Sequence, residues 1–433
     1  MIAVGVTLAA ILVVLLLLGY PMKVPLLASA LVAVLAFDAF RYVSPEVLIQ
    51  QWITGIQPAA LIAVPMFLFA ADVMTRGQAA DRLLDFVTTF VGHYRGGLPI
   101  ASAVGCTLFG AISGSTQATV VAIGGPLRPR LVQAGYSDSF TMALIINASD
   151  IALLIPPSIG MIVYGVVSRT SIGELFIAGI GPGLLILVLF SIYSRIAAQR
   201  MGIEPMARSS AALRWAAVRR ALLPLGFPVI IIGGIYSGIF SPTEAAAVSV
   251  LYAVVLEMLV FRELGLRDLP QLALGTGLVT SVVFVLVAAG SAFSWVISYA
   301  QLPSQIIGQT LGLTPDSSYT AIMAAIAVSF FIGCMFVDPI VVILIMTPIF
   351  HPLAVAAGID PVLVGVLVTL QVAVGSATPP FGCDIFTAVA IFRRPYLDVI
   401  RGTPPFILIL LLATVLLIVF PQISLALRDL AFG

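Results

Sequence analysis

One spacing of glycines and prolines occurs twice in this chain and restricts the folds open to it. The first set is Gly110, Pro129, Gly135, Pro156 and Pro157, and the second set, 223 residues later, is Gly333, Pro352, Gly358, Pro379 and Pro380. The two stretches share little else. Because glycine and proline mainly determine backbone conformation, the repeated spacing predicts two copies of one backbone plan.

The apolar character of the chain places both copies in a membrane. Hydrophobic residues make up 61% of the 433 residues and charged residues only 9%, whereas a soluble domain carries about 25% charged residues. The apolar run at residues 2–18 is expected to be long enough to cross about 30 Å of hydrocarbon and is not preceded by positive charge, so we interpret it as a membrane helix and not as a cleaved signal peptide. The sequence predicts an all-α polytopic membrane protein.

The distribution of arginine predicts the topology. The most polar stretch, residues 195–220, holds six arginines and is expected to be cytoplasmic. We expect membrane spans at residues 2–20, 24–40, 59–75, 138–168, 173–193, 222–239, 243–260, 273–298, 362–392 and 404–424. Residues 42–58 and 77–94 are too polar to span and are expected to lie along the interface.

Five spans on each side of this stretch give two halves of opposite orientation. We expect a first inverted repeat at residues 1–194, a cytoplasmic linker at 195–221 and a second inverted repeat at 222–433. Both termini are then outside, and among the 20 lysines and arginines only Arg41, Arg169 and Arg428 lie outside with them. The opposite orientation would reverse the charge bias that membrane proteins show.

In each half, one of the spans and one additional segment are interrupted by small, polar or proline residues. Residues 98–130 and 317–355 are expected to form re-entrant helical hairpins, and residues 138–168 and 362–392 to form broken helices. Non-helical backbone at membrane depth is tolerated only where protein or a water-filled cavity surrounds it. Paired interruptions of this kind in the two halves of a membrane protein indicate the binding site of a transporter.

Several short motifs carry a resemblance to a known family. They are GAISGSTQAT at 110–119, GY at 135–136, LIPPS at 154–158, SPTEAAA at 241–247, GIDP at 358–361 and TPPFG at 378–382. In this order, over essentially the whole chain, they resemble the large membrane subunit of the tripartite ATP-independent periplasmic (TRAP) transporters.

The resemblance implies an elevator-type secondary transporter of the ion-transporter superfamily in the bacterial inner membrane. It implies coupling to sodium ions with no other cofactor, and import of an organic acid such as a C4-dicarboxylate, sialic acid or a related carboxylate. It also implies two partners, a small four-helix membrane subunit and a periplasmic binding protein that delivers the substrate.

The candidate site residues follow from the breaks and from the resemblance. Hydroxyl and carbonyl oxygens are suitable sodium ligands. The repeat places Asp338 in the second half at the position equivalent to Ser115 in the first. The resemblance assigns one sodium site to Ser113, Ser115 and Ile155 and a second to Asp338, Gly375 and Thr378. Substrate is expected near Thr116, Gln117, Asp150, Pro157, Ser158 and Pro379. The structural breaks are expected at Gly110, Gly114, Pro156, Gly333 and Pro380.

Some of these residues also have an ordinary structural interpretation. Serine and threonine in membrane helices often bond a nearby backbone carbonyl, and Glu244 fits the first turn of a helix as well as it fits a functional role. Asp150 and Asp384 depart from the family pattern, which at Asp150 usually has a small or apolar residue. A carboxylate facing the cavity would disfavour a dicarboxylate, so we expect Asp150 to tune specificity.

Three other functions remain as alternatives. A stand-alone anion or dicarboxylate carrier of the same architecture would need neither partner, and genes for a binding protein and a small membrane subunit beside this one would argue against it. An intramembrane enzyme is a remote alternative, because the two histidines and the three cysteines, Cys106, Cys334 and Cys383, form no recognisable catalytic motif. A passive channel fits two inverted hairpins less well than alternating access does.

Overall fold

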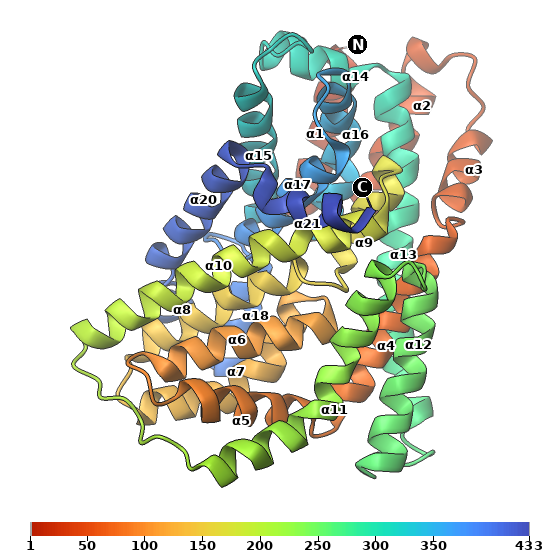
Figure 1. Ribbon diagram of the computed structural model, residues 1–433. Helices are drawn as coiled ribbons and strands as arrows, with labels where there is room; N and C mark the ends of the chain where they lie inside the picture. Colours follow the sequence, from red (N-terminus) through yellow and green to blue (C-terminus); the bar gives the residue numbers. More distant parts are fainter. Residues whose placement is uncertain (1, 433) are drawn as a thin grey trace.

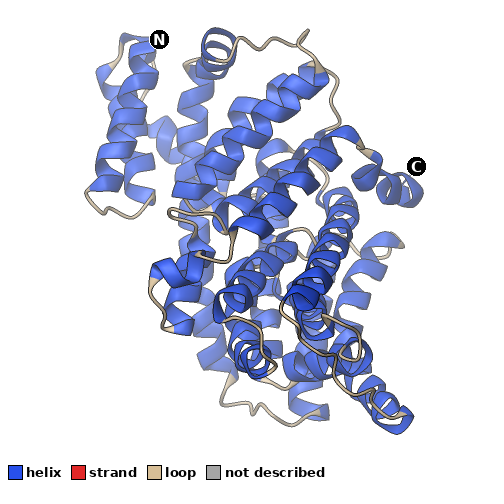
Figure 2. Cartoon of the chain, turned by 90° about the vertical axis from the view of Figure 1, so that its left-hand side faces the viewer, coloured by secondary structure: helices blue, strands red, loops and turns tan. Residues whose placement is uncertain are grey.

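The computed structural model describes residues 2–432, and within this range every regular element is a helix (Figure 2). The elements up to residue 200 are α1 (Ile2–Leu17), α2 (Lys23–Ala36), η1 (Asp38–Phe40), α3 (Glu46–Gly55), η2 (Ala59–Ile62), α4 (Ala63–Arg76), α5 (Ala79–Val91), α6 (Gly97–Ser113), α7 (Thr116–Gln133), α8 (Asp138–Ser149), η3 (Asp150–Leu153), α9 (Ile159–Ser168) and α10 (Ile172–Arg200).

The remaining elements are α11 (Ala211–Tyr236), α12 (Pro242–Val255), η4 (Leu256–Val260), α13 (Leu269–Tyr299), α14 (Leu302–Gln305), η5 (Ile306–Thr310), α15 (Tyr319–Phe336), α16 (Pro339–Ala356), α17 (Pro361–Ser376), α18 (Cys383–Phe392), α19 (Tyr396–Ile400), α20 (Pro404–Val419) and α21 (Gln422–Phe432). The predicted all-α fold is confirmed, and seven described helices are long and apolar enough to cross a membrane, or eight if the bent pair α20–α21 counts as one span.

The repeated spacing of glycines and prolines corresponds to repeated helix boundaries. α7 and α16 both begin and end 223 residues apart, and α9 and α18 match the same offset to within one residue. The expected hairpins are the pairs α6–α7 and α15–α16, and the expected broken helices are α8–α9 and α17–α18. The opposite orientation of the two halves stays a prediction.

The N-terminal spans are shorter than expected. α1 has 16 residues and α2 has 14, and at about 1.5 Å per residue neither alone crosses about 30 Å of hydrocarbon. α1 ends before Gly19, whose φ of 81° belongs to the left-handed region, and α2 ends at the extended Phe37. The sequence showed continuous apolar runs but not these backbone turns.

The expected linker at residues 195–221 is helical over much of its length. α10 continues to Arg200, and α11 begins at Ala211 after Ser210, whose side chain accepts a hydrogen bond from Leu213 N. Only residues 201–210 lie outside helices. Polar composition indicated exposure correctly, but an exposed segment can still be helical.

The helices fall into two packed groups (Figure 1). In one group the long helix α13 packs against α2, α3 and α4, while α12 packs against α4 and α11. In the other group the hairpins and broken helices pack against one another and against α10. α16 contacts α13 and so connects the two groups.

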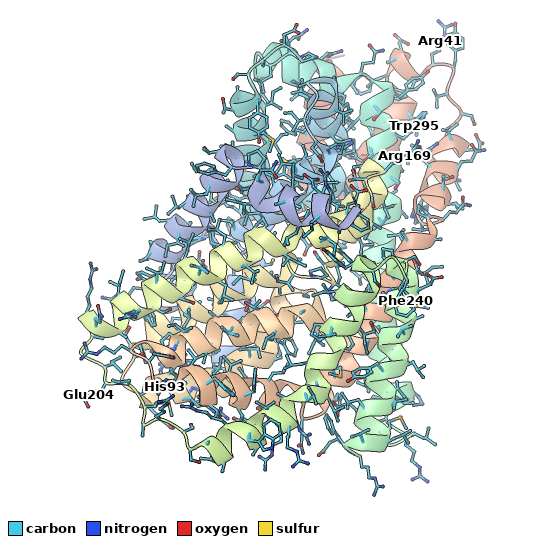
Figure 3. All side chains as sticks on the ribbon, in the orientation of Figure 1. Arg41, His93, Arg169, Glu204, Phe240 and Trp295 are labelled. Atoms are coloured by element: carbon cyan, nitrogen blue, oxygen red, sulfur yellow. The ribbon has the colours of Figure 1, made fainter. Side chains whose placement is uncertain are left out.

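The two ends of the molecule carry the residues that the topology assigns to opposite sides. Figure 3 places Arg41 and Arg169 in its upper half and His93 and Glu204 in its lower half. α1 and α21 both lie in the upper half of Figure 1, and α5, from the segment expected at the interface, lies at the lower end. Residues that the topology assigns to different sides therefore lie at different ends of the molecule, while the predicted charge distribution and the side that faces the cytoplasm stay predictions.

Glu244 has a structural role at the start of α12. Its carboxylate accepts hydrogen bonds from the backbone N and the hydroxyl of Ser241, both at 2.8 Å, while Ser241 Oγ accepts one from Glu244 N. This reciprocal arrangement is a capping box. Of the two interpretations of Glu244, the structure supports the helix start.

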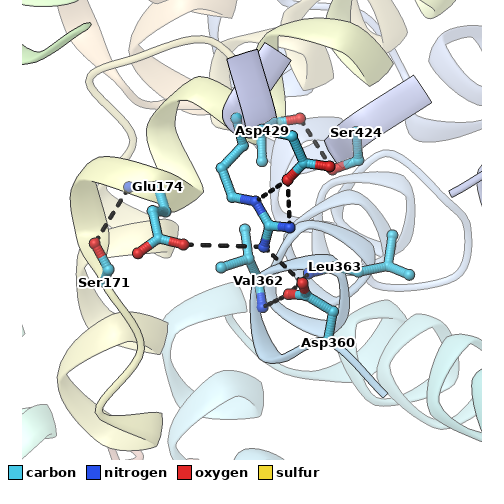
Figure 4. Close-up of polar contacts among 9 residues, drawn as sticks. Ser171, Glu174, Asp360, Val362, Leu363, Ser424 and Asp429 are labelled. Carbon is cyan, nitrogen blue, oxygen red and sulfur yellow. Dashed lines mark hydrogen bonds and ion pairs between the residues drawn. The ribbon is translucent and has the colours of Figure 1, made fainter. Parts of the chain in front are cut away.

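One guanidinium group joins the C-terminal helix to the start of α17 and approaches α10. Arg428 donates to Asp360 at 2.6 Å and to Asp429 at 2.6 Å, and it lies 3.9 Å from Glu174. Figure 4 shows these three carboxylates converging from three helices. Asp360 also caps α17 by accepting from Val362 N at 2.8 Å, so this contact joins α21 to a broken helix.

We expect Arg428→Gln to destabilise this junction by about 1 kcal/mol, because hydrogen bonds to charged groups are worth about 1.5–3 kcal/mol before solvent screening reduces them. The thermal unfolding temperature of the detergent-solubilised protein should fall, and α21 should become easier to cleave with protease. Arg401→Gln, at an exposed position, is the matched control and should change neither. Equal effects in both variants would contradict this role.

Candidate functional site

The hairpin tips and the first break surround a cavity of about 320 Å³. Residues at one tip, Gly114 to Gln117, and at the other, Asp338 to Ile340, line it together with Leu153, Ile159 and Gly160. The facing wall is apolar and consists of Leu68 on α4 with Val279, Val282, Val283 and Leu286 on α13. The cavity therefore lies where the two groups of helices meet.

The first hairpin tip is seated directly on the first break. Gly114 ends α6 with a φ of 61°, and a Cβ added there would lie 2.2 Å from the carbonyl oxygen of Pro157. Ile159 N donates to the carbonyl of Gly114 at 3.4 Å. Only glycine adopts this left-handed backbone so close to the carbonyl oxygen of Pro157 without strain.

The second hairpin tip repeats this plan with a carboxylate. Asp338 caps α16 by accepting from Ile340 N at 2.9 Å, as Ser115 caps α7 by accepting from Ala118 N at 3.4 Å. The predicted equivalence of Ser115 and Asp338 is thus visible as two helix N-caps. Near this tip, Phe381 N of the second break donates to Met335 O at 3.2 Å.

A buried carboxylate connects the first hairpin to the second break. Asp384, in the first turn of α18, is fully buried. Its carboxylate accepts from Thr116 Oγ1 at 2.8 Å and from Ser376 Oγ at 2.6 Å. Because Thr116 lines the cavity and Asp384 lies behind it, the two repeats meet at the cavity wall.

Five of the predicted site residues line the cavity: Gly114, Ser115, Thr116, Gln117 and Asp338. The others lie nearby but in different surroundings. Ser158 is fully buried, and its hydroxyl accepts from Met161 N at 3.2 Å to cap α9. Pro157 lies behind Gly114, and Asp150 is fully buried. Pro379 is not among the residues that line the cavity.

The predicted sodium ligands lie at the two junctions of tip and break. Ser113 Oγ is 3.1 Å from Thr119 Oγ1, and Thr378 Oγ1 donates to Val374 O at 2.6 Å. Gly375 packs closely under α15, where an added Cβ would be 2.6 Å from Cys334 Cβ. Ile155 packs against Gly183. Their roles as ligands stay predictions.

The predicted structural breaks are close packing positions. A Cβ at Gly110 would lie 2.6 Å from Ala152 Cα, and one at Gly333 would lie 3.1 Å from Met346 Cε. Pro156 and Pro380 each belong to a Pro–Pro pair in the non-helical segment of its break. These residues shape the backbone and do not supply ligand atoms from their side chains.

Sequence reasoning missed the hydroxyl of Ser376 and the apolar wall of the cavity. Ser376 holds Asp384 from eight residues away, a relation that a serine in an apolar run does not reveal. The wall residues of α13 have the same character as lipid-facing residues, so no sequence signal separated them.

The profile of the family described as "Tripartite ATP-independent periplasmic transporter, DctM component" matches residues 9–423. The chain belongs to this family. It is therefore the large permease subunit of a TRAP transporter, a multi-pass membrane protein and not an enzyme. As its name states, the family works in tripartite, ATP-independent systems with a periplasmic component.

Relatives of this large permease are named as transporters of different substrates. The ectoine TRAP transporter large permease of Halomonas elongata is 63% identical over 96% of this chain and 97% of its own length. The ectoine/5-hydroxyectoine large permease of Ruegeria pomeroyi is 63% identical over 97% and 98%. The C4-dicarboxylate large permease of Pseudomonas aeruginosa is 38% identical over 85% and 86%.

A solved structure shares the fold of this large permease. The YdaH transporter of Alcanivorax borkumensis superposes with a TM-score of 0.67 and covers 91% of both chains. The sequence identity is 17%, so this likeness supports the fold alone.

Proposed function

We propose that this large permease imports ectoine or 5-hydroxyectoine. The observation that carries the proposal is the 63% identity, over nearly full length, to two permeases named for these substrates. The relative named for C4-dicarboxylates is 38% identical. Ectoine carries a carboxylate, so it belongs to the predicted class of organic acids. As the proposed substrate it takes the place of the C4-dicarboxylates and sialic acid, which the family resemblance named first.

The charges around the cavity support a zwitterionic substrate. Ectoine combines a carboxylate with a delocalised amidinium cation on a small ring. The N-terminus of α7 lies at the cavity and favours a carboxylate. Asp338 on the wall and Asp384 behind Thr116 favour a cation and would repel the second carboxylate of a dicarboxylate.

The proposed mechanism is sodium-coupled elevator transport. The two hairpins and the two broken helices would move as one unit past a scaffold that includes α2, α4 and α13, carrying substrate in the cavity and sodium at the two junctions. The bond from Thr116 to Asp384 supports a single unit, because it fastens the first hairpin to the second break. The α13 residues that line the cavity are all apolar, which supports sliding of the tips past them; further along α13, Ser294 donates to Leu344 O of α16 at 2.9 Å, and this bond would have to break in the movement.

Two partners complete the proposed system. A small four-helix membrane subunit would enlarge the scaffold, and a periplasmic binding protein would deliver the substrate. The exposed apolar residues of α11 and α13, such as Leu222 and Leu278, provide faces that lipid or a membrane partner can cover.

The test is uptake of labelled ectoine into proteoliposomes that hold this chain and the small subunit encoded beside it. Each reaction is run with and without the neighbouring binding protein and a sodium gradient, and with labelled succinate and sialic acid as competing substrates. We expect ectoine uptake only when both the gradient and the binding protein are present. Uptake without the binding protein would favour a stand-alone carrier, and preferential uptake of succinate would contradict the substrate assignment.

A further inference from the structure

Two buried polar side chains in the first broken helix have oxygen atoms without a hydrogen-bond partner among the residues that the structure describes. Asn147 and Asp150 are both fully buried. Both carboxylate oxygens of Asp150 and Oδ1 of Asn147 have no hydrogen-bond partner within residues 2–432. Residues three apart in a helix project from the same side, so these three oxygens belong to one face where α8 passes into η3.

A second carboxylate lies across from this face. η3 packs against α17 and α7, and Asp384 is held at the junction of these elements by Thr116 and Ser376. Asp150 begins η3, and the two hydroxyls that hold Asp384 belong to α7 and α17, the elements on which η3 packs. The hydroxyl donors satisfy Asp384 in part, whereas Asp150 receives none.

No cationic side chain compensates these two carboxylates. None of the ion pairs within the part of the chain that the structure describes includes Asp150 or Asp384. Removing an unpaired charge from water costs several kcal/mol or more. A bound cation would offset this cost and satisfy the free oxygens together.

We propose that Asn147, Asp150 and Asp384 form a binding site for a dehydrated sodium ion, separate from the two sodium sites at the hairpin tips. The oxygen atoms available as ligands are an amide oxygen and carboxylate oxygens, which suit a hard cation. Calcium takes about six to eight oxygen ligands, and within the described residues no group of three or more acidic, histidine or cysteine side chains could hold a metal. A monovalent ion fits this smaller set.

The position of the site indicates what the ion would do. Asp150 begins η3 in the first helix break, which packs against α7 and α17, and Asp384 contacts the cavity residue Thr116. An ion here would stabilise the junction of the two repeats and fix Thr116 at the cavity wall. This inference rests on the proposed sodium-coupled function, but ion binding can be measured separately from transport.

The test compares the wild type with Asp150→Asn, which keeps the shape and removes the charge. In proteoliposomes the ratio of ²²Na⁺ to ectoine taken up should fall by one ion per substrate. In the purified transporter without substrate, the thermal stabilisation by NaCl over choline chloride should need about tenfold more sodium, a loss of about 1.4 kcal/mol in binding. Ser194→Ala, which removes a different buried hydroxyl without a described partner, should match the wild type in both measurements.

Each other outcome would overturn the site. If the ratio of sodium to ectoine taken up is unchanged and the KM for ectoine rises, Asp150 is a substrate contact. If that ratio is unchanged and uptake loses a dependence on the pH gradient, Asp150 is a proton site. Should Asp150→Asn fail to fold, Asn147→Leu removes one oxygen at similar size, and an unaltered sodium requirement in the thermal assay would refute the proposal. Failure of the proposed function would appear differently, as absent sodium-driven ectoine uptake in the wild type.

Discussion

Replacing Gly114 with alanine should abolish transport while leaving the protein in the membrane. The left-handed backbone costs an alanine about 1–2 kcal/mol. Its Cβ would also meet the carbonyl oxygen of Pro157 at 2.2 Å, an overlap that adds about 1–3 kcal/mol. Because the tip of the first hairpin then cannot seat on the first break, substrate uptake per amount of protein should fall at least about hundredfold, equivalent to about 2.7 kcal/mol.

Gly358 provides a matched control for this prediction. It has a similar φ of 74°, but an alanine Cβ there meets no atom within 4 Å. Gly358→Ala should therefore lose only the conformational part, about 1 kcal/mol, and should keep most of its uptake. Equal losses of uptake in the two variants would mean that backbone strain alone, and not the seating of the tip on the break, explains the effect of Gly114→Ala.

Replacing Thr116 with valine should have the second largest effect. Valine has the same shape but cannot donate to Asp384, so a fully buried carboxylate keeps only the donor from Ser376. A hydrogen bond to a charged group is worth about 1.5–3 kcal/mol. We expect uptake to fall by at least about tenfold, which corresponds to about 1.4 kcal/mol, together with a lower thermal unfolding temperature.

Thr116→Ser separates the hydrogen bond from the packing around it. Serine retains the hydroxyl and loses only a methyl group, so it should restore most of the uptake that valine removes. If serine and valine were equally impaired, the hydroxyl bond to Asp384 would not be what holds the first hairpin to the second break.

The backbone plan of this protein was largely predictable from the sequence. Glycine at a turn and proline at a break leave few conformations open, and the repeated spacing coincides with repeated helix boundaries in α7 and α16 and in α9 and α18. The assignment of these helices to re-entrant hairpins and broken spans stays a prediction. The end of α1 near residue 17 and the continuation of α10 to Arg200 were not predictable in the same way. Apolar or polar composition shows the environment of a segment, but it does not show where within that segment a helix ends.

The candidate site was predictable only in part. The tip residues Ser115, Thr116 and Asp338 were expected at the cavity because the breaks expose helix ends there, and they line it. Ser158 was expected with them, but its hydroxyl caps α9 inside the protein. The pairing of Thr116 with Asp384 joins residues 268 positions apart, and only the packing of the second break against the first hairpin brings them together.

Protection of a cavity cysteine by substrate tests the account most directly. Leu68→Cys, in a background of Cys383→Ser, places a thiol on the apolar wall opposite the hairpin tips. In the reconstituted transporter, ectoine together with sodium should slow its reaction with a small permeant maleimide, whereas succinate should not. Glu204→Cys, at the opposite end of the molecule from Arg41 (Figure 3), should react at the same rate with or without ectoine. A Leu68→Cys transporter that takes up ectoine yet reacts at an unchanged rate would show that substrate binds elsewhere.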